Sequence, residues 1–163
     1  MATRIELLQR MPVFGAIRDD TLQFLLQQSR SLTVRAGAFF FREHDAASSM
    51  FVLEAGRASV VKGWQGRDFV VHELAAGDCF GELALLDLCS RSAGVRAEDD
   101  CRAVELTGET LLQLFERDAE QFALIQMNIA REVCRRLRAT DELLFRARMG
   151  EQDLGRESLF LAA

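Results

Sequence analysis

The chain has 163 residues, the size of a single domain, and its net charge of −5 argues against a broad nucleic-acid-binding surface. Hydrophobic residues make up 49% and charged residues 28%, as in a globular domain with a buried core. The first residues hold no apolar run after the first basic one, and the longest apolar stretches are far too short to cross a bilayer. We therefore expect no signal peptide, no membrane contact and a cytoplasmic protein.

Cysteine and histidine spacing gives no metal or redox motif. The four cysteines are scattered without a CxxC pair, at Cys79, Cys89, Cys101 and Cys134. A metal-dependent jelly-roll enzyme would need several histidines in a tight cluster, whereas this chain has only His44 and His72, far apart in the sequence. No Ser/His/Asp order, nucleophile elbow or Walker-type loop is present in the sequence. We expect reduced, mostly buried thiols, no metal site and no enzymatic activity.

Two short helices are predicted within residues 5–30. The first covers Ile5 to Met11. The second follows Asp19 and Asp20, which suit an N-cap and a first helical turn. Its apolar residues, Leu22, Leu25 and Leu26, recur at helical spacing.

From residue 31 to residue 106 the pattern becomes one of short, Val- and Phe-rich runs separated by glycine. The predicted strands are Ser31–Val34, Ala38–Phe41, Ser49–Ala55, Arg57–Lys62, Asp68–Leu74, Cys79–Phe80, Ser92–Ala97 and Cys101–Leu106. The predicted turns carry Gly37, Gly56, Gly63, Gly66 and Gly77, and Ser48 and Ser49 are interpreted as turn residues. Short strands joined by glycine turns indicate a mainly β fold, a sandwich or jelly roll with flanking helices, rather than βαβ units.

Helical spacing returns over residues 110–149. A short segment from Thr110 to Arg117 leads into a long helix from about Ala119 to Met149. Its apolar stripe consists of Phe122, Ile125, Ile129, Val133, Leu137, Thr140 and Leu144, at the spacing of a core-facing or coiled-coil seam. The tail, residues 150–163, has two glycines and an apolar patch, and is either disordered or docked on the body.

The segment 77–97 carries the chemistry. Gly81 lets the backbone approach a ligand, and the helical turn that starts at Glu82 leaves unpaired N–H groups that suit an anion. Arg91 can place two donors on an anionic oxygen pair, and Ser92 adds a hydroxyl. Glu82 is an acceptor suited to a sugar hydroxyl. Taken alone, Arg91 is an ordinary loop arginine and Glu82 a carboxylate at a helix N-terminus.

The sequence FGELALL followed by RSAGVRA resembles the phosphate-binding cassette of the cyclic-nucleotide-binding family, which includes catabolite activator proteins and regulatory domains of kinases and channels. The resemblance covers nearly the whole chain. It implies one cyclic-nucleotide-binding domain over residues 1–163. Its fold would be a β-roll (a double-stranded β-helix) over residues 31–106, between N-terminal helices and a long C-terminal helix.

The resemblance also implies a role for each site residue. Glu82 would hold the ribose 2′-hydroxyl and Arg91 the cyclic phosphate. The phosphate cradle would be completed by the backbone of Gly81 and Leu83 and by Ser92, with Ala93 at the start of the next strand. Thr140 and Asp141 lie where related activators place their base contacts, although Thr140 also suits a seam residue and Asp141 a surface residue.

Two residues depart from the family pattern. His44 stands where a glycine is usual, on the strand scaffold away from the cassette, so we expect a local change of turn only. Gly94 replaces a larger residue, which predicts a looser strand after the cassette.

The choice of nucleotide rests on two opposing residues. Ser92, rather than threonine, favours cAMP over cGMP in this family, whereas Asp141 favours cGMP if it reaches the base, because a carboxylate accepts from two guanine donors. We expect cAMP or cGMP as the ligand, with cAMP preferred. Other cyclic nucleotides, or lost binding, stay open.

Signalling is expected through movement of the C-terminal helix on binding. Its apolar stripe predicts a homodimer through the 119–149 helix, unless the stripe packs only on its own β-roll. About fourteen residues follow Met149, too few for a helix-turn-helix, so we expect no DNA binding. The chain would then act on an effector protein in trans, belong to a longer chain or buffer nucleotide. The alternative is a nucleotide-independent dimerisation module. The presence of all four expected ligand-binding residues argues against it: Gly81, Glu82, Arg91 and Ser92.

Overall fold

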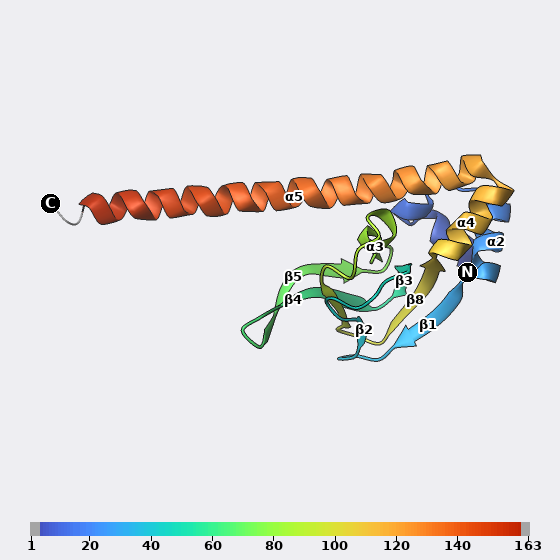
Figure 1. Ribbon diagram of the computed structural model, residues 1–163, viewed down its shortest axis with the longest axis horizontal. Helices are drawn as coiled ribbons and strands as arrows, with labels where there is room; N and C mark the ends of the chain where they lie inside the picture. The colour runs from blue at the N-terminus through green and yellow to red at the C-terminus, as the bar shows by residue number, and fades with distance from the viewer. Residues whose placement is uncertain (1–3, 161–163) are drawn as a thin grey trace. The chain divides into compact units, whose positions relative to one another are not determined.

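The computed structural model describes residues 4–160, with side chains for residues 4–150. Its N-terminal part contains helix α1 (Arg4–Gln9), the 3₁₀ helix η1 (Pro12–Phe14) and helix α2 (Asp19–Gln28) (Figure 1). The first helix is shorter than predicted, and η1 was not predicted. Pro12 begins η1, since a proline has no N–H to lose at a first helical position. Arg18 is the N-cap of α2, and both aspartates lie in the first turn.

Eight strands follow, arranged in two antiparallel four-stranded sheets. The strands are β1 (Arg30–Val34), β2 (Phe39–Phe41), β3 (Ser49–Ala55), β4 (Arg57–Trp64), β5 (Arg67–Ala75), β6 (Cys79–Phe80), β7 (Gly94–Ala97) and β8 (Cys101–Thr107). The strand orders are β1-β8-β3-β6 and β2-β7-β4-β5. The mainly β jelly-roll fold expected from the short runs and glycine turns is therefore confirmed.

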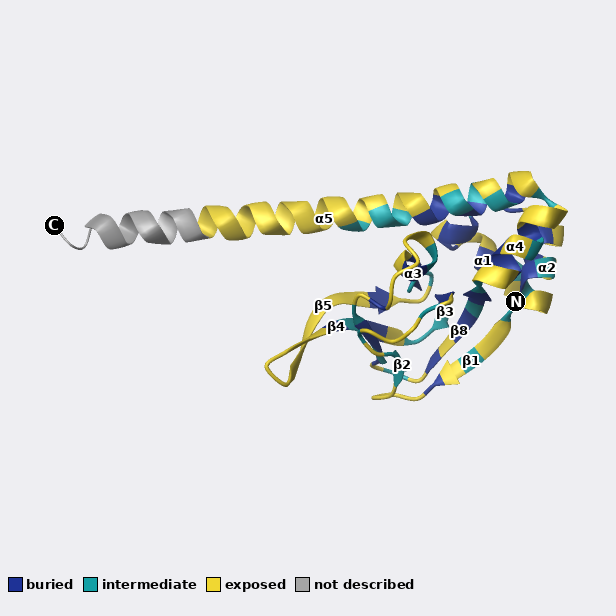
Figure 2. Cartoon of the chain, viewed as in Figure 1, coloured by how far each residue is buried: buried dark blue, intermediate teal, exposed yellow. Residues whose placement is uncertain are grey.

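The hydrophobic core lies between the two sheets. Period-2 alternation sends one side of each strand inward, and the buried cluster draws on both sheets, as the dark strands of Figure 2 show. Its members are Val34, Phe51, Leu53, Ala58, Leu74, Phe80, Val95, Ala97, Cys101 and Ala103. Four phenylalanine rings cluster at one end of this core, where Phe51 stacks on Phe80 at a centroid distance of 5.4 Å and Phe40 and Phe41 pack beside them.

Most strands begin or end a residue or two from the predicted position, and two of these shifts affect named residues. Gly63 lies inside β4 rather than in a turn, and the β4–β5 hairpin turns at Gln65 and Gly66, both with positive φ. Strand β7 begins at Gly94 rather than at Ser92, so Ser92 and Ala93 belong to the preceding loop. In both places the hydrogen-bonded register, and not the local apolar pattern, decides where the strand ends.

Two helices follow the β-roll, α4 (Gly108–Arg117) and α5 (Ala119–Phe160). A first compact unit ends at Asn128 within α5. Thr107 caps α4 by accepting from the backbone N–H of Thr110. Asn128 donates to the carbonyl oxygens of Val13 and Gly15, at 3.2 and 2.9 Å. These bonds tie the start of α5 to the N-terminal segment.

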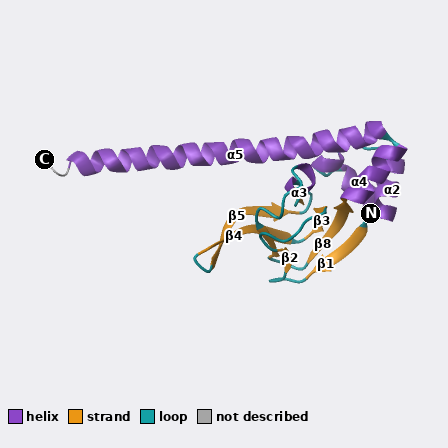
Figure 3. Cartoon of the chain, in the orientation of Figure 1, coloured by secondary structure: helices purple, strands orange, loops and turns teal. Residues whose placement is uncertain are grey.

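A second compact unit begins at Ile129 and consists of the remainder of α5. The predicted helix end at Met149 is wrong, because the helix continues through Gly150 to Phe160 (Figure 3). One glycine costs a helix only about 1 kcal/mol relative to alanine, and the residues around it are good helix formers. Within this unit the apolar residues Leu137 and Leu144 are 58% and 52% exposed.

The expectation of mostly buried thiols is only half right. All four cysteines are free thiols, with Cys79 and Cys101 buried and Cys89 and Cys134 exposed. Among the described residues, no helix combines the length and hydropathy needed to cross a bilayer.

Candidate functional site

The predicted cassette is a strand end, a glycine and one helical turn. Strand β6 ends at Phe80, Gly81 has a φ of +77°, and helix α3 (Leu83–Leu86) follows with Glu82 as its N-cap. A Cβ at position 81 would lie 2.6 Å from the NH1 atom of Arg91. Gly81 is thus required both by its left-handed backbone and by the close approach of the arginine.

The Arg91 side chain turns inward and is only 5% exposed. Its NH1 group donates to the carbonyl oxygen of Gly81 at 2.9 Å. The guanidinium lies 4.0 Å from the Phe41 ring centroid and 5.7 Å from that of Phe51, in cation–π contact with the phenylalanine cluster. Arg91 and Gly81, ten positions apart in the sequence, are therefore in direct contact.

Ser49 and Glu105 extend this arrangement. The NH2 group of Arg91 donates to Ser49 Oγ at 3.4 Å, and Ser49 Oγ donates to Glu105 Oε1 at 2.8 Å. Ser49 is the buried first residue of β3, which confirms the predicted strand Ser49–Ala55 and makes the interpretation of Ser49 as a turn residue wrong. The local pattern placed Ser49 at the strand boundary but gave no sign of its contact with Arg91.

Arg91 is a buried cation with three carboxylates in its electrostatic environment. Burial lowers the pKa of Arg91, and the nearby carboxylates of Glu105, Asp45 and Glu82 oppose that shift by stabilising the charged form. Within the described part of the chain, the buried Nε of Arg91 has no hydrogen-bond partner. A buried cationic donor with unused capacity binds an anionic oxygen well.

Glu82 is 2% exposed, so its carboxyl is held inside the cassette and not on the surface. Its backbone carbonyl accepts from the N–H groups of Leu85 and Leu86, at 3.0 and 3.2 Å, which closes the single turn of α3. Burial on this turn places Glu82 in the electrostatic environment of Arg91. The cassette therefore holds a buried carboxyl near the buried Arg91 guanidinium.

The placement of His44 away from the cassette is wrong. His44 has a φ of +71°, and its N–H donates to the Arg91 carbonyl at 2.8 Å. The Arg91 N–H in turn donates to the carbonyl of Asp45 at 2.9 Å. This turn therefore fixes the backbone of Arg91, and its left-handed φ explains why a glycine is usual there.

Gly94 does not loosen β7. It is buried and pairs with Val61 across the sheet. A Cβ at this position would lie 3.3 Å from both Phe39 Cε1 and Val61 Cγ2. A larger residue would have to displace these side chains, so the glycine permits close packing.

The remaining predicted residues are more exposed. Leu83 begins α3 and is 40% exposed, Ser92 is exposed, and Ala93 is half-buried. Thr140 and Asp141 lie on α5 in the second unit, where Thr140 donates to the carbonyl of Arg136 at 2.9 Å. Their assignment as base contacts stays a prediction.

Comparison with known proteins gives a family match. Residues 31–118, more than half of the chain, match the family model described as the cyclic nucleotide-binding domain. The crystal structure of Thermus thermophilus catabolite activator protein has a TM-score of 0.71 and 26% identity to this chain, covering 82% of it and 61% of that chain. Together these matches account for the two sheets, the cassette and the helix that follows.

Two curated relatives are similar in sequence. The cAMP-dependent protein kinase regulatory subunit of Schizosaccharomyces pombe is 33% identical over 92 residues, which cover 56% of this chain and 22% of that protein. An uncharacterized NTE family protein of Mycobacterium tuberculosis is 30% identical over 131 residues, covering 80% and 21%. The chain thus spans about a fifth of the length of these two relatives.

Proposed function

This chain belongs to the cyclic nucleotide-binding domain family, and from that premise we propose that it is a sensor that binds a cyclic nucleotide in the cassette 77–97. The observation that carries the proposal is the buried guanidinium of Arg91, whose Nε has no hydrogen-bond partner among the described residues. A cyclic phosphate offers two anionic oxygens to such a donor set. We assign no reaction to the site, whose groups suit binding.

Each residue of the cassette would contact a different part of the nucleotide. Arg91 exchanges its bond to the Gly81 carbonyl for bonds to the cyclic phosphate. The backbone of Gly81 and Leu83 and the hydroxyl of Ser92 complete the cradle. Glu82 accepts from the ribose 2′-hydroxyl, because a carboxylate is repelled by phosphate and suited to a hydroxyl donor. Ala93 lies at the close-packed entry to β7.

We favour cAMP over cGMP as the ligand. Ser92 supports cAMP by family resemblance, and the Schizosaccharomyces pombe relative is named as cAMP-dependent. Asp141 supports cGMP only if it reaches the base. The ratio of the two affinities decides between them.

Binding becomes a signal through the C-terminal helix. The ligand stabilises one of two helix positions by its differential affinity, and an effector protein in the cytoplasm reads the difference. The exposed apolar residues Leu137 and Leu144 support a homodimer through the 119–149 helix. An apolar stripe at this spacing is covered when a second copy packs against it.

Calorimetric titration with cAMP and cGMP tests the proposal. We expect micromolar or tighter binding by the wild-type chain and a loss of about 100-fold in Arg91→Lys, because lysine lacks the planar fork that pairs two oxygens. Arg67→Lys, an exposed substitution in the hairpin, is the matched control. No heat with either nucleotide from folded protein would leave a nucleotide-independent dimerisation module as the better account.

A further inference from the structure

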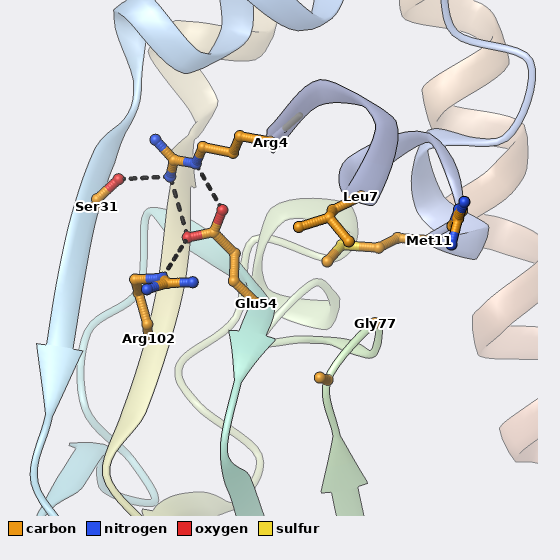
Figure 4. Close-up of a pocket in the computed structure, with 9 residues that line it drawn as sticks. Arg4, Leu7, Met11, Ser31, Glu54, Gly77 and Arg102 are labelled. Carbon is orange, nitrogen blue, oxygen red and sulfur yellow. Dashed lines mark hydrogen bonds and ion pairs between the residues drawn. The ribbon is translucent and has the colours of Figure 1, made fainter. Parts of the chain in front are cut away.

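A cavity of about 640 Å³ opens on the sheet that contains β1, β3 and β8, and it shares only Gly77 with the cassette 77–97. Its lining comes from α1, from these strands and from the turn before β6 (Figure 4). The lining residues are Arg4, Leu7, Arg10, Met11, Ser31, Glu54, Ala76, Gly77 and Arg102. The volume lies in the range of small-molecule sites, about 300–1,000 Å³.

One side of the cavity is a cluster of two arginines on one glutamate. Arg4 donates to Glu54 through Nε at 2.7 Å and NH2 at 3.0 Å. Arg102 Nε lies 3.4 Å from Glu54 Oε2. The Glu54 side chain is only 6% exposed, whereas those of Arg4 and Arg102 are 45% and 60% exposed. Both glutamate oxygens therefore already have a guanidinium partner.

The cavity therefore carries excess positive charge. Arg10 adds a third guanidinium to the lining, against the single carboxylate of Glu54. In the described part of the chain, neither Arg10 nor the terminal nitrogens of Arg102 have a side-chain partner. A guanidinium has five N–H donors, and those that remain unused face solvent or a ligand.

The other side of the cavity is apolar. Leu7, which is 48% exposed, and the buried Met11 lie across from the arginine cluster in Figure 4. Gly77 has no atom within 4 Å of the position of a Cβ, so the turn leaves this space open. A ligand here meets an apolar wall and unused cationic donors together.

We propose that this cavity binds a small amphipathic anion, with a carboxylate or phosphate ester on the unused donors of Arg102 and an apolar body on Leu7 and Met11. Charge on one wall and apolar surface on the other select both halves of such a molecule. Glu54 holds the Arg4 and Arg102 guanidiniums together and lowers their mutual repulsion. The site shares only Gly77 with the cassette 77–97, and none of its lining residues is among the proposed nucleotide contacts.

The test uses octanoate and octyl phosphate as probes. Octan-1-ol, which lacks the anionic group, and acetate, which lacks the apolar chain, are the comparison molecules. We expect calorimetry to detect binding of at least one of the two amphipathic anions, and much weaker binding of octan-1-ol and acetate. Arg102→Gln should weaken anion binding about tenfold or more, since a charged hydrogen-bonding partner is lost. Arg67→Gln is the matched control. It removes the same charge from the exposed β4–β5 hairpin and should bind like wild type.

Methyl-labelled methionine locates the probe. Octanoate should shift the Met11 methyl resonance and leave that of Met127, an exposed residue of α5, unchanged. Equal binding of octan-1-ol, equal affinities in the two arginine variants, or no Met11 shift would overturn the proposal. Cyclic-nucleotide titration of the same Arg102→Gln protein reports on the cassette separately, so failure of one site is distinguishable from failure of the other.

Discussion

Arg91 connects three parts of the β-roll through one buried side chain. It bonds the carbonyl of Gly81 after β6, lies over Phe41 of β2 and donates to Ser49 of β3. The spacing FGELALL…RSAGVRA predicted that Gly81 and Arg91 belong to one site. Ser49 and Glu105 escaped prediction because their positions in the sequence are remote from the motif and only strand pairing brings them close.

At the residue scale, Gly81→Ala should separate backbone strain from the arginine contact. A φ of +77° costs an L-residue about 1–2 kcal/mol, and the new Cβ would also displace Arg91 NH1. We expect a lower free energy of unfolding and at least a tenfold weaker affinity for cAMP by calorimetry.

The control for this substitution is Gly66→Ala. Gly66 has a nearly equal φ of +76°, with no atom within 4 Å of the added Cβ. It should lose similar stability and keep its cAMP affinity. Equal affinities in both variants would show that contact between position 81 and Arg91 does not matter for binding.

At the element scale, the sheet β2-β7-β4-β5 packs closely around Gly94. A Cβ on Gly94 in β7 would lie 3.3 Å from Phe39 and Val61, whereas a Cβ on Gly63 in β4 would have no atom within 4 Å. The sequence pattern predicted strands in both regions, but not that position 94 is crowded while position 63 is open. Which side chains surround a glycine depends on how distant segments pair, and the local pattern does not carry that information. The same reasoning applies to the His44–Asp45 turn, which bonds the Arg91 backbone.

Gly94→Val should destabilise the domain by about 1–3 kcal/mol through overpacking. Gly63→Val adds the same methyl groups to an exposed strand position and should be near neutral or slightly stabilising. Urea unfolding followed by circular dichroism measures both. If the two variants have equal midpoints, the packing at Gly94 is not limiting.

The junction of α2 and α5 should give a measurable pH dependence. The N–H of Gln121 donates to Asp118 at 3.0 Å and Arg18 pairs with the same carboxylate, and these interactions lower the pKa of Asp118 from 3.8. A lowered folded-state pKa contributes stability above the unfolded value, and that stability is lost as the pH falls through the folded value.

We therefore expect Asp118→Asn to unfold at a lower temperature than wild type at pH 7, with the gap closing below about pH 4. Thermal unfolding from pH 2 to pH 7 measures this gap. Asp68→Asn, in the exposed hairpin, controls for the loss of one negative charge. A gap that stays constant over the whole range would contradict an ionic role for Asp118.

At the scale of the whole molecule, the exposed apolar residues Leu137 and Leu144 of α5 suggest a partner, whereas Ile125 and Ile129 of the same stripe are already buried. Leu137 and Leu144 are seven residues apart, which places them on one helix face, and both are largely exposed. In a proposed homodimer the same residues from each copy would face one another.

The double substitution Leu137→Glu and Leu144→Glu should convert a dimer into monomers in sedimentation equilibrium, because four carboxylates would then be buried at one seam. Ala139→Glu introduces one such carboxylate per chain on another face of the helix and should leave the dimer intact. A wild-type chain that sediments as a monomer at micromolar concentration would contradict the homodimer.

The amino-acid sequence by itself determined the mainly β fold, the flanking helices and the membership of Gly81, Glu82 and Arg91 in one segment. These features depend on local periodicity, glycine placement and short-range spacing, which a sequence carries directly. Only the tertiary structure decided that Arg91 turns inward onto Phe41, that Ser49 and Glu105 lie behind it and that α5 continues past Gly150. Contacts across the sheets depend on strand pairing between distant segments, and a glycine inside a helix is tolerated or not according to the helix around it.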